Sequence, residues 1–272
     1  MASINTNYGA AIALQNLNKT NSELERTQNR INTGMKVSTA KDSGAIFAIA
    51  TSQRANASSQ DAVRGSLQRG QSIVDVALAA GDTITSALEE MKSLAVSIAS
   101  STGAAKTSYE SEFTALGKEI KSALDGATFD GVNLLTTAST GATEVKVQTG
   151  TGAADTKTIG TTAALSANTD LAKFTAATPA VADYTVANVD LVITAVTGAL
   201  STLGTQSKSI GRSITFVNKL QDSLEAGVGN LVDADLAKES AKLTALQTKQ
   251  QLGVQALSIA NQGSSILLSL FR

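Results

Sequence analysis

Apolar side chains recur in alternating steps of three and four residues along two long stretches of the chain. The first stretch runs from Leu67 to Ile98 and the second from Val192 to Val228. This spacing places apolar side chains on one face of a helix and is typical of helices that pack side by side. We therefore expect two long helices whose packed face, called here the rod seam, includes Val74, Ile84, Leu88, Met91, Ile98, Val192, Val196, Ile210 and Val217.

The two ends of the chain carry a weaker form of the same pattern. Between Ala10 and Ile31 the apolar stripe is interrupted by Asn21 and Gln28, and the last stretch has glutamines among its apolar positions. Thin apolar stripes are best buried against each other, so we expect the two ends to pair. The side chains expected in this contact, called here the terminal seam, are Leu14, Leu17, Leu24, Ile31, Leu243, Leu246, Leu257, Ile266 and Leu267.

The breaks between helices are marked by glycine and by short polar segments. Gly34 is expected to stop the first helix, and residues 37–43 to connect it to the next. A further helix is expected from Ser108 to Leu124.

The middle of the chain, residues 136–178, differs in kind because it is rich in threonine and glycine. Val145 and Val147 alternate with polar residues, and the Asp130-Gly131 dipeptide before them is typical of a tight turn. The predicted fold is therefore mainly α: long antiparallel helices in a coiled-coil or helical bundle, with the N- and C-termini paired, plus a small β-hairpin-like middle region.

Composition limits the size of any core. Aromatic residues make up 3% of the chain and tryptophan is absent, so each residue brings little apolar area to bury. The chain has one proline, Pro179, which permits long uninterrupted helices on either side. Extended helices fit these numbers better than a large globule.

Charge and residue types exclude several function classes. The net charge of −1, with both signs scattered, indicates no electrostatic binding of nucleic acid. Cysteine and histidine are absent, which removes thiol chemistry and the commonest general base and metal ligand. Acid pairs such as Asp233 with Asp235, or Glu110 with Glu112, are explained by the preference for acids near helix starts. We expect no enzyme activity and no catalytic, cofactor or metal site.

Targeting and membrane signals are weak. The first residues lack the basic lead-in and apolar block of a cleaved secretory signal. The most apolar short runs, residues 45–50 and 73–80, fall below the ~18 residues that cross a bilayer. We therefore expect no membrane insertion.

Three segments resemble bacterial flagellins. The run LERTQNRINTGMKVSTAKDSGAIFAIA, residues 24–50, resembles the N-terminal signature of that family, with a connector that includes Gly34, Ala40, Lys41 and Asp42. TFDGVNLL, residues 128–135, resembles the turn after the N-terminal helices, and the run from Asp233 to Arg272 resembles the closing helix. The middle matches nothing in particular, as in a short flagellin that lacks large outer domains.

The resemblance implies three regions. Residues 1–40 and 233–272 would form the inner coiled-coil layer of a filament core. Residues 41–135 and 188–232 would form a helical rod, and residues 136–187 a short, variable and partly β surface region.

The resemblance also implies the setting in which the protein works. A flagellin is exported unfolded through the flagellar type III export apparatus, is served by an export chaperone, and folds under the filament cap. It polymerises into a helical tube, the propeller for swimming motility, which hook–filament junction proteins attach to the hook. The expected location is secreted, in the extracellular flagellar filament, and the expected main partner is the chain itself, with co-assembling flagellins left open.

The weak apolar pattern at the ends supports assembly on physical grounds. A helix pair interrupted by Asn21, Gln28, Gln250 and Gly253 buries little apolar area, while ordering a chain has a large entropic cost. We expect residues 1 to about 40 and 233–272 to be disordered in the monomer and helical in the polymer.

Two surface features follow from the resemblance. In the family, an innate immune receptor recognises the helix surface that here includes Glu89, Glu90 and Leu94, and it uses an arginine where this chain has Glu90. The reversed charge predicts altered recognition, whereas a solvated helix face also accounts for these glutamates. The threonine-rich middle is a candidate for O-linked sugars, or threonine serves strand propensity there.

Other functions remain as alternatives. A hook–filament junction protein shares a flagellin-like N-terminus, but the match from Asp233 to the C-terminus favours flagellin. A type III-secreted, membrane-active translocator would need longer apolar spans. A secreted hydrolase lacks the residue types for catalysis.

Overall fold

The computed structural model of the protein describes residues 7–176 and 179–269, with side chains to residue 262. The chain forms two compact units. Unit 1 comprises Met1–Ala55 and Ser223–Arg272, and unit 2 comprises Asn56–Asp222. Two long helices, α2 (Gly44–Ser100) and α5 (Val186–Val232), each contribute residues to both units.

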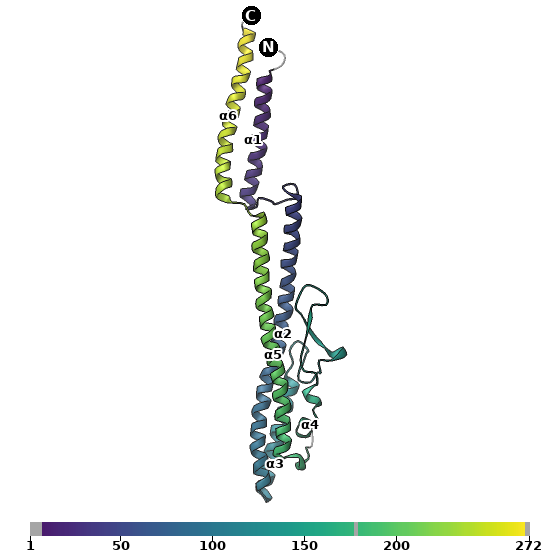
Figure 1. Ribbon diagram of the computed structural model, residues 1–272. Coiled ribbons are helices and arrows are strands. Elements are labelled where there is room, and N and C mark those ends of the chain that lie inside the picture. Colours follow the sequence, from purple (N-terminus) through teal and green to yellow (C-terminus); the bar gives the residue numbers. More distant parts are fainter. Residues whose placement is uncertain (1–6, 177–178, 270–272) are drawn as a thin grey trace. The chain divides into compact units, whose positions relative to one another are not determined.

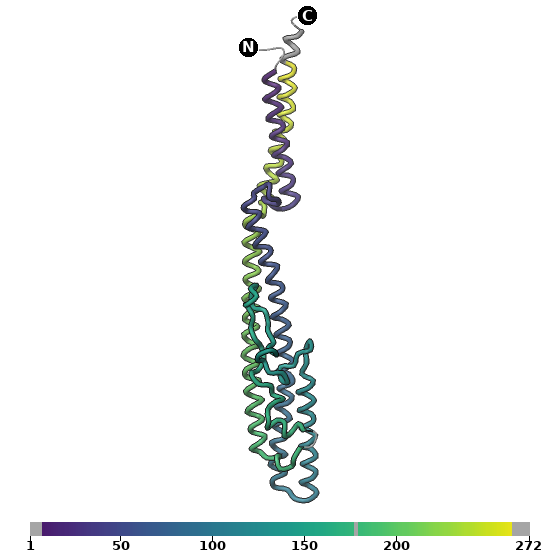
Figure 2. Tube along the Cα trace, turned by 90° about the vertical axis from the view of Figure 1, so that its right-hand side faces the viewer, coloured from purple at the N-terminus to yellow at the C-terminus, as the bar shows by residue number. Residues whose placement is uncertain are grey.

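Unit 1 is built around an antiparallel pair of helices, α1 (Tyr8–Thr33) and α6 (Leu236–Ser269), which run side by side in both views (Figure 1, Figure 2). The start of α1 and the end of α6 lie at the same end of the pair, where the side-chain amide of Asn7 donates to the carbonyl of Ala260 at 2.8 Å. The predicted pairing of the two ends of the chain is confirmed.

Local sequence signals set the ends of these two helices. The Asn7 side chain accepts a hydrogen bond from the Ala10 amide at 3.0 Å, which caps α1. Gly34 ends α1 in the left-handed conformation, with φ 70°, where a residue without a Cβ is favoured. The Asp235 carboxylate caps α6 by accepting from the amides of Ala237 and Lys238, both at 3.1 Å. Asp235 therefore has a specific role as the hydrogen-bonding cap of α6, in addition to the general preference for acids near helix starts.

Unit 2 is a bundle in which α2 and α5 pack together with α3 (Gly103–Gly126) (Figure 1). One continuous apolar core joins them, and Leu67, Ile84 and Ile120 are fully buried in it. Glycine lets the two long helices approach, because the position of a Cβ on Gly81 lies 2.1 Å from Leu200 Cδ2. The core is therefore deep in unit 2, despite the small number of aromatic residues.

A hairpin lies against this bundle. Strand β1 (Val145–Gln148) pairs antiparallel with β2 (Thr156–Ile159), with Val145 opposite Ile159. Gln206 on α5 holds its end, because its side-chain amide donates to the Gly160 carbonyl and accepts from the Gly160 amide, both at 2.8 Å. The predicted small β region is confirmed, as is the mainly helical fold.

The Asp130-Gly131 turn precedes the hairpin. Both residues have positive φ, 50° and 76°, and Phe129 and Val132 exchange backbone hydrogen bonds of 2.9 Å across it. This geometry is the one that an Asp-Gly dipeptide favours.

The segment expected to be only strands and turns also contains helical structure. Helix α4 (Thr169–Thr175) begins where the Asn168 side chain accepts from the amides of Asp170 and Leu171, at 3.0 and 2.9 Å. Phe174 of α4 meets Phe113 of α3 edge to face, with ring centroids 5.3 Å apart. Short 3-10 turns complete the segment: η1 (Gly141–Thr143), η2 (Leu165–Ala167) and η3 (Val181–Asp183).

By length and composition alone, α5 is apolar enough to cross a membrane. Its apolar positions Val192, Val196 and Ile210 are buried in the core of unit 2. Core packing therefore accounts for these apolar positions, while 22% of the most apolar 18-residue window of α5 is buried. No long contiguous apolar run marks α5 in the sequence, because alanine, threonine and glycine separate its valines and isoleucines.

Candidate functional site

The contact between α1 and α6 is the candidate assembly site in unit 1. Its shielded positions follow the three-and-four spacing on both helices. On α1 the positions with this spacing are Ala10, Ala13, Leu17, Thr20, Leu24, Thr27 and Ile31, with Asn21, Glu23 and Arg30 also partly shielded beside them, and on α6 they are Glu239, Leu243, Leu246, Gln250, Gly253, Leu257 and Ala260. The two helices approach closely at Gly253, where an added Cβ would lie 3.2 Å from Leu17 Cδ1.

One residue of the expected terminal seam lies outside the contact between α1 and α6. Leu14 is 49% exposed, and the neighbouring Ala13 faces α6 in its place. The sequence pattern favoured the larger side chain, whereas close packing of two helices uses the smaller one. Leu17, Leu24, Ile31, Leu243, Leu246 and Leu257 face the contact, while the side chains of Ile266 and Leu267 lie outside the described residues.

This contact is shallow. Among the described side chains of α1 only Thr27 is buried, and among those of α6 only Leu246. A second small cluster joins Val37 and Ala50 to Val228 and Val232 near the connector. Unit 1 therefore buries far less apolar side chain for its length than unit 2.

Polar groups cross the α1–α6 contact, and sequence reasoning missed their partners. The Gln250 side-chain amide donates to Asn21 Oδ1 at 2.8 Å. Arg30 Nη1 lies 3.0 Å from Glu239 Oε1, with side chains 26% and 12% exposed. Thr27 Oγ1, Arg30 Nε and Glu239 Oε2 are buried without a hydrogen-bond partner among the described residues. Opposite charges at shielded positions of both helices were the available signal, but the helix register was not readable from the sequence.

The connector after α1 is tied together by one carboxylate. Asp42 accepts from the amide and hydroxyl of Thr39, both at 3.1 Å, and from those of Ser38 at 3.2 and 3.3 Å. The hydrogen bond from the Thr39 amide is the largest cause that holds the pKa of Asp42 below its ordinary value. Ala40 and Lys41 form the exposed tip of this turn.

The residues of the expected rod seam meet in unit 2. Val74, Ile84, Leu88, Met91, Val192, Val196 and Ile210 are fully buried, with Val217 at 1% and Ile98 at 5% exposure, and all belong to the same core cluster. The Tyr184 ring stacks on Phe113 at 4.3 Å and its hydroxyl lies 2.9 Å from Thr114 Oγ1. The rod seam therefore holds unit 2 together and is not available to partners.

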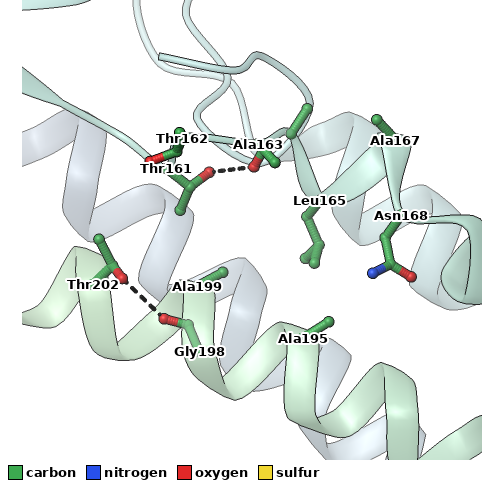
Figure 3. Close-up of a pocket in the computed structure, with 11 residues that line it drawn as sticks. Thr161, Thr162, Ala163, Leu165, Ala167, Asn168, Ala195, Gly198, Ala199 and Thr202 are labelled. Atoms are coloured by element: carbon green, nitrogen blue, oxygen red, sulfur yellow. Dashed lines mark hydrogen bonds between the residues drawn. The ribbon is translucent and has the colours of Figure 1, made fainter. Parts of the chain in front are cut away.

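A shallow pocket of about 300 Å³ lies between residues 161–168 and α5 (Figure 3). The Thr161 hydroxyl donates to the Ala163 carbonyl at 2.8 Å, and the Thr202 hydroxyl to the Gly198 carbonyl at 3.0 Å. Its other lining side chains are small or apolar apart from Thr162 and Asn168, and none is charged. The pocket therefore offers no group for acid–base or metal chemistry.

The expected receptor surface lies on α2. Glu89 and Glu90 are exposed, whereas Leu94 is partly buried and packs against the core. Glu90 and Leu94 line a groove of about 520 Å³ between α2 and α3, together with Ser93, Glu112, Ala115, Leu116 and Glu119. The groove has an acidic rim and an apolar floor.

Comparison with known proteins places this architecture in a family. The family model of the bacterial flagellin N-terminal helical region matches residues 4–140, and that of the bacterial flagellin C-terminal helical region matches residues 186–271. The two matches cover both helical parts of the chain and leave out the hairpin and α4.

The chain is similar to named flagellins, and each similarity covers nearly the whole of both chains. The chain is 54% identical to flagellin FljK of Caulobacter vibrioides, covering 99% of this chain and 98% of that protein. It is 40% identical to a flagellin of Brucella melitensis and 32% identical to flagellin C of Rhizobium meliloti, with each chain covered completely. The chain therefore belongs to the bacterial flagellin family, whose members are structural subunits of the flagellar filament and not enzymes.

Proposed function

We propose that unit 1 of this subunit is completed only by neighbouring subunits in the filament. In this proposal, residues 1–40 and 233–272 form the inner coiled-coil layer of the tube. Residues 41–135 and 188–232 form the rod of its wall, and residues 136–187 lie on its surface. The observation that carries the proposal is the shallow α1–α6 contact, in which Thr27 and Leu246 are the buried side chains among those described.

The energetic argument compares the two units. A long helix gains most of its stability from packing its apolar face, because its own hydrogen bonds leave it marginal in water. In unit 2 the packed face is deep, and Val74, Leu88 and Val192 are fully buried. In unit 1 the exposed apolar side chains include Ile12 at 56% and Ile259 at 69%. Burial of such side chains against other subunits supplies the stabilisation that the pair lacks alone.

Hydrogen exchange on monomer and filament tests this proposal. Amides of α1 and α6 should exchange rapidly in the monomer and slowly in the filament. Amides of α2 and α5 within unit 2 should be protected in both states, which controls for loss of the whole fold. Strong protection of α1 and α6 in the monomer would refute the proposal.

The family implies a secreted protein in an extracellular filament. We further propose that the flagellar type III export apparatus, an export chaperone, the filament cap and hook–filament junction proteins are partners, because flagellin export and assembly use them. A shallow unit 1 suits this route, since little packing must be broken before export. Co-purification of the chain with each partner, against a variant lacking residues 233–272, is the test.

The outer face of α6 is rich in amides, and Gln255 and Gln262 are exposed. We propose that this face lines a channel that neither grips nor repels a passing unfolded chain; an ordinary solvated helix face is the alternative. Lysine at both positions should slow export of later subunits without changing the filament. An unchanged export rate would favour the alternative.

Glu89 and Glu90 stand on the surface that an innate immune receptor recognises in other flagellins. We propose that the reversed charge at Glu90 weakens that recognition. Glu90→Arg should raise receptor activation above background. Activation that stays at background would show that this position alone does not decide recognition.

Threonine is frequent in residues 136–178, and Thr140, Thr151 and Thr162 among others are exposed. We propose that this segment carries O-linked sugars on the outside of the filament. Intact-mass measurement of protein from its native cells decides between this proposal and threonine that serves only strand and turn structure.

A further inference from the structure

The Asp130-Gly131 turn in unit 2 combines an exposed carboxyl group with an unhindered backbone amide. The Asp130 side chain is 52% exposed, and a Cβ added to Gly131 would meet no atom within 4 Å beyond its chain neighbours. The Gly131 amide donates no hydrogen bond to any residue that the structure describes. In such a dipeptide the backbone nitrogen can attack the aspartate side chain, because no Cβ on the following residue stands in the way.

The reaction is an isomerisation of the backbone. The Gly131 nitrogen bonds to Asp130 Cγ, and the carboxyl hydroxyl and the amide hydrogen leave together as water. The product is a five-membered succinimide ring, which water then opens. Cleavage at Cγ restores aspartate, whereas cleavage at the backbone carbonyl carbon gives isoaspartate, in which the chain runs through Cγ. The water lost is regained, and nothing is oxidised or reduced.

The conformation of the turn lies one peptide rotation away from the reactive geometry. Asp130 and Gly131 both have positive φ, 50° and 76°, which defines a type I′ turn. Its first central ψ of about +30° places the Gly131 nitrogen nearly opposite the Asp130 Cβ. Rotation of the peptide plane between the two residues gives a type II′ turn with ψ of about −120°, which brings that nitrogen in line with Cβ for ring closure. Glycine permits this rotation because it accepts either sign of φ.

Arg69 of α2 restrains the other reacting group. Its Nε lies 2.6 Å from Asp130 Oδ2, and the Arg69 side chain is 62% exposed. Ring closure requires the Asp130 side chain to swing toward the backbone and therefore to leave Arg69. An exposed ion pair of ordinary strength makes that departure up to about fivefold less frequent.

We propose that Asp130 is a site of spontaneous isoaspartate formation and that Arg69 is the positioning residue that slows it. The site belongs to the single chain and does not depend on polymerisation. Isoaspartate adds one atom to the backbone of the turn, so Phe129 and Val132 can no longer exchange both of their 2.9 Å hydrogen bonds.

The effect of the isomer extends into the core. Asn133, directly after the turn, is 8% exposed and donates to the Leu124 carbonyl at the end of α3 at 2.7 Å. Leu134 and Leu135 follow it and are fully buried. A longer turn therefore loosens the segment that closes the end of α3.

Ageing of the purified full-length monomer in neutral buffer tests the proposal. Isoaspartate is located by peptide mapping, and labelling with an isoaspartyl methyltransferase gives a second readout. Arg69→Met is the test variant, because it keeps an unbranched apolar stem and removes the cation. Asp130→Glu is the matched control, since attack on its longer side chain must close a six-membered ring, which forms far more slowly.

The chain also contains an internal reference, the second Asp-Gly dipeptide at Asp125 and Gly126. Asp125 lies in the last turn of α3 and pairs with Lys121 at 3.0 Å, so it does not depend on Arg69. Wild type should accumulate isoaspartate at Asp130, and Arg69→Met about two- to fivefold faster, with the rate at Asp125 unchanged. In unfolding concentrations of urea the effect of Arg69 should vanish, because the ion pair exists only in the folded chain.

Each outcome decides one part of the proposal. Faster isomerisation confined to Asp130 in folded Arg69→Met supports it, as does a loss of urea stability on ageing in wild type but not in Asp130→Glu. If folded wild type forms no isoaspartate at Asp130 while the unfolded chain does, the site is overturned. Equal rates in wild type and Arg69→Met, or an equal acceleration at Asp125, overturn the role of Arg69.

Discussion

Gly117 is the position at which the packing of unit 2 gives the sharpest prediction. An added Cβ at Gly117 of α3 would lie 2.3 Å from the carbonyl oxygen of Phe174 and 3.2 Å from its carbonyl carbon. Those atoms are backbone, so they cannot turn aside as a side chain would. Gly117→Ala must displace α4, and with it the Phe174 ring, which is 1% exposed against the core.

Two effects of opposite sign determine how much Gly117→Ala changes the free energy of unfolding. Alanine improves the helix propensity of α3 by about 1 kcal/mol. Overpacking of a close-packed core costs about 1–3 kcal/mol, and a backbone clash lies at the upper end of that range. We expect a net loss of about 1–2 kcal/mol in the free energy of unfolding of the monomer. That loss corresponds to a fall of roughly 2–8 °C in its melting temperature.

The matched control is Gly65→Ala on α2. Gly65 is exposed, and no atom lies within 4 Å of its added Cβ. The same chemical change should therefore stabilise the monomer, by up to about 1 kcal/mol. Urea unfolding followed by circular dichroism measures both variants. Equal effects of the two substitutions, or a stabilised Gly117→Ala, would refute the claim that α4 backbone closes over α3.

Three further predictions concern the core, the helix pair and the connector. Phe174→Ala should destabilise unit 2 by about 3 kcal/mol in urea unfolding, because it removes a buried ring. Arg30→Leu should lower the dissociation temperature of the filament by leaving Glu239 unpaired, and Leu at both positions should restore much of it. The lowered pKa of Asp42 means that its contribution to connector stability is present above the ordinary aspartate pKa. That contribution is lost as pH falls through the lowered value, so the protection factor of the Thr39 amide, the exchange rate of an unstructured peptide at the same pH divided by its own, should fall in acid in the wild type but depend less on pH in Asp42→Asn.

The deep core could be predicted from the sequence because the side chains that form it are large and regularly spaced. Val74, Leu88, Val192 and Ile210 stand out as apolar positions in any helical projection, and each is buried in one cluster. Gly34 could be read as a helix stop because its function depends on local backbone conformation alone. In both cases the sequence signal lies within a single segment: the last turn of a helix for Gly34, and the apolar face of a long helix for the core positions.

The missed features depend on contacts between segments far apart in sequence. Ala13 rather than Leu14 faces α6, because the distance between two packed helices, and not apolar size, selects the residue at the contact. Arg30 meets Glu239 only once the register of α1 on α6 is fixed. Helix α4 was hidden by a threonine-rich composition, although Asn168 followed by Thr169 and Asp170 is a helix-start signal.

Unit 2 has a deep apolar core and unit 1 does not, so the subunit can fold stably in unit 2 while the helices of unit 1 still lack packing partners. Helices α2 and α5 run from the deep core of unit 2 into unit 1. There Ala50 and Val228 belong to the small apolar cluster near the connector. Extending a helix that already exists avoids the unfavourable nucleation step, so these parts are ordered at low cost. Helices α1 and α6 lie beyond the breaks at Gly34 and Asp235, so each needs its own nucleus and its own packed face. Because their mutual contact buries little, we propose that their order depends on other subunits, and that the polymer is the state in which the whole chain is folded.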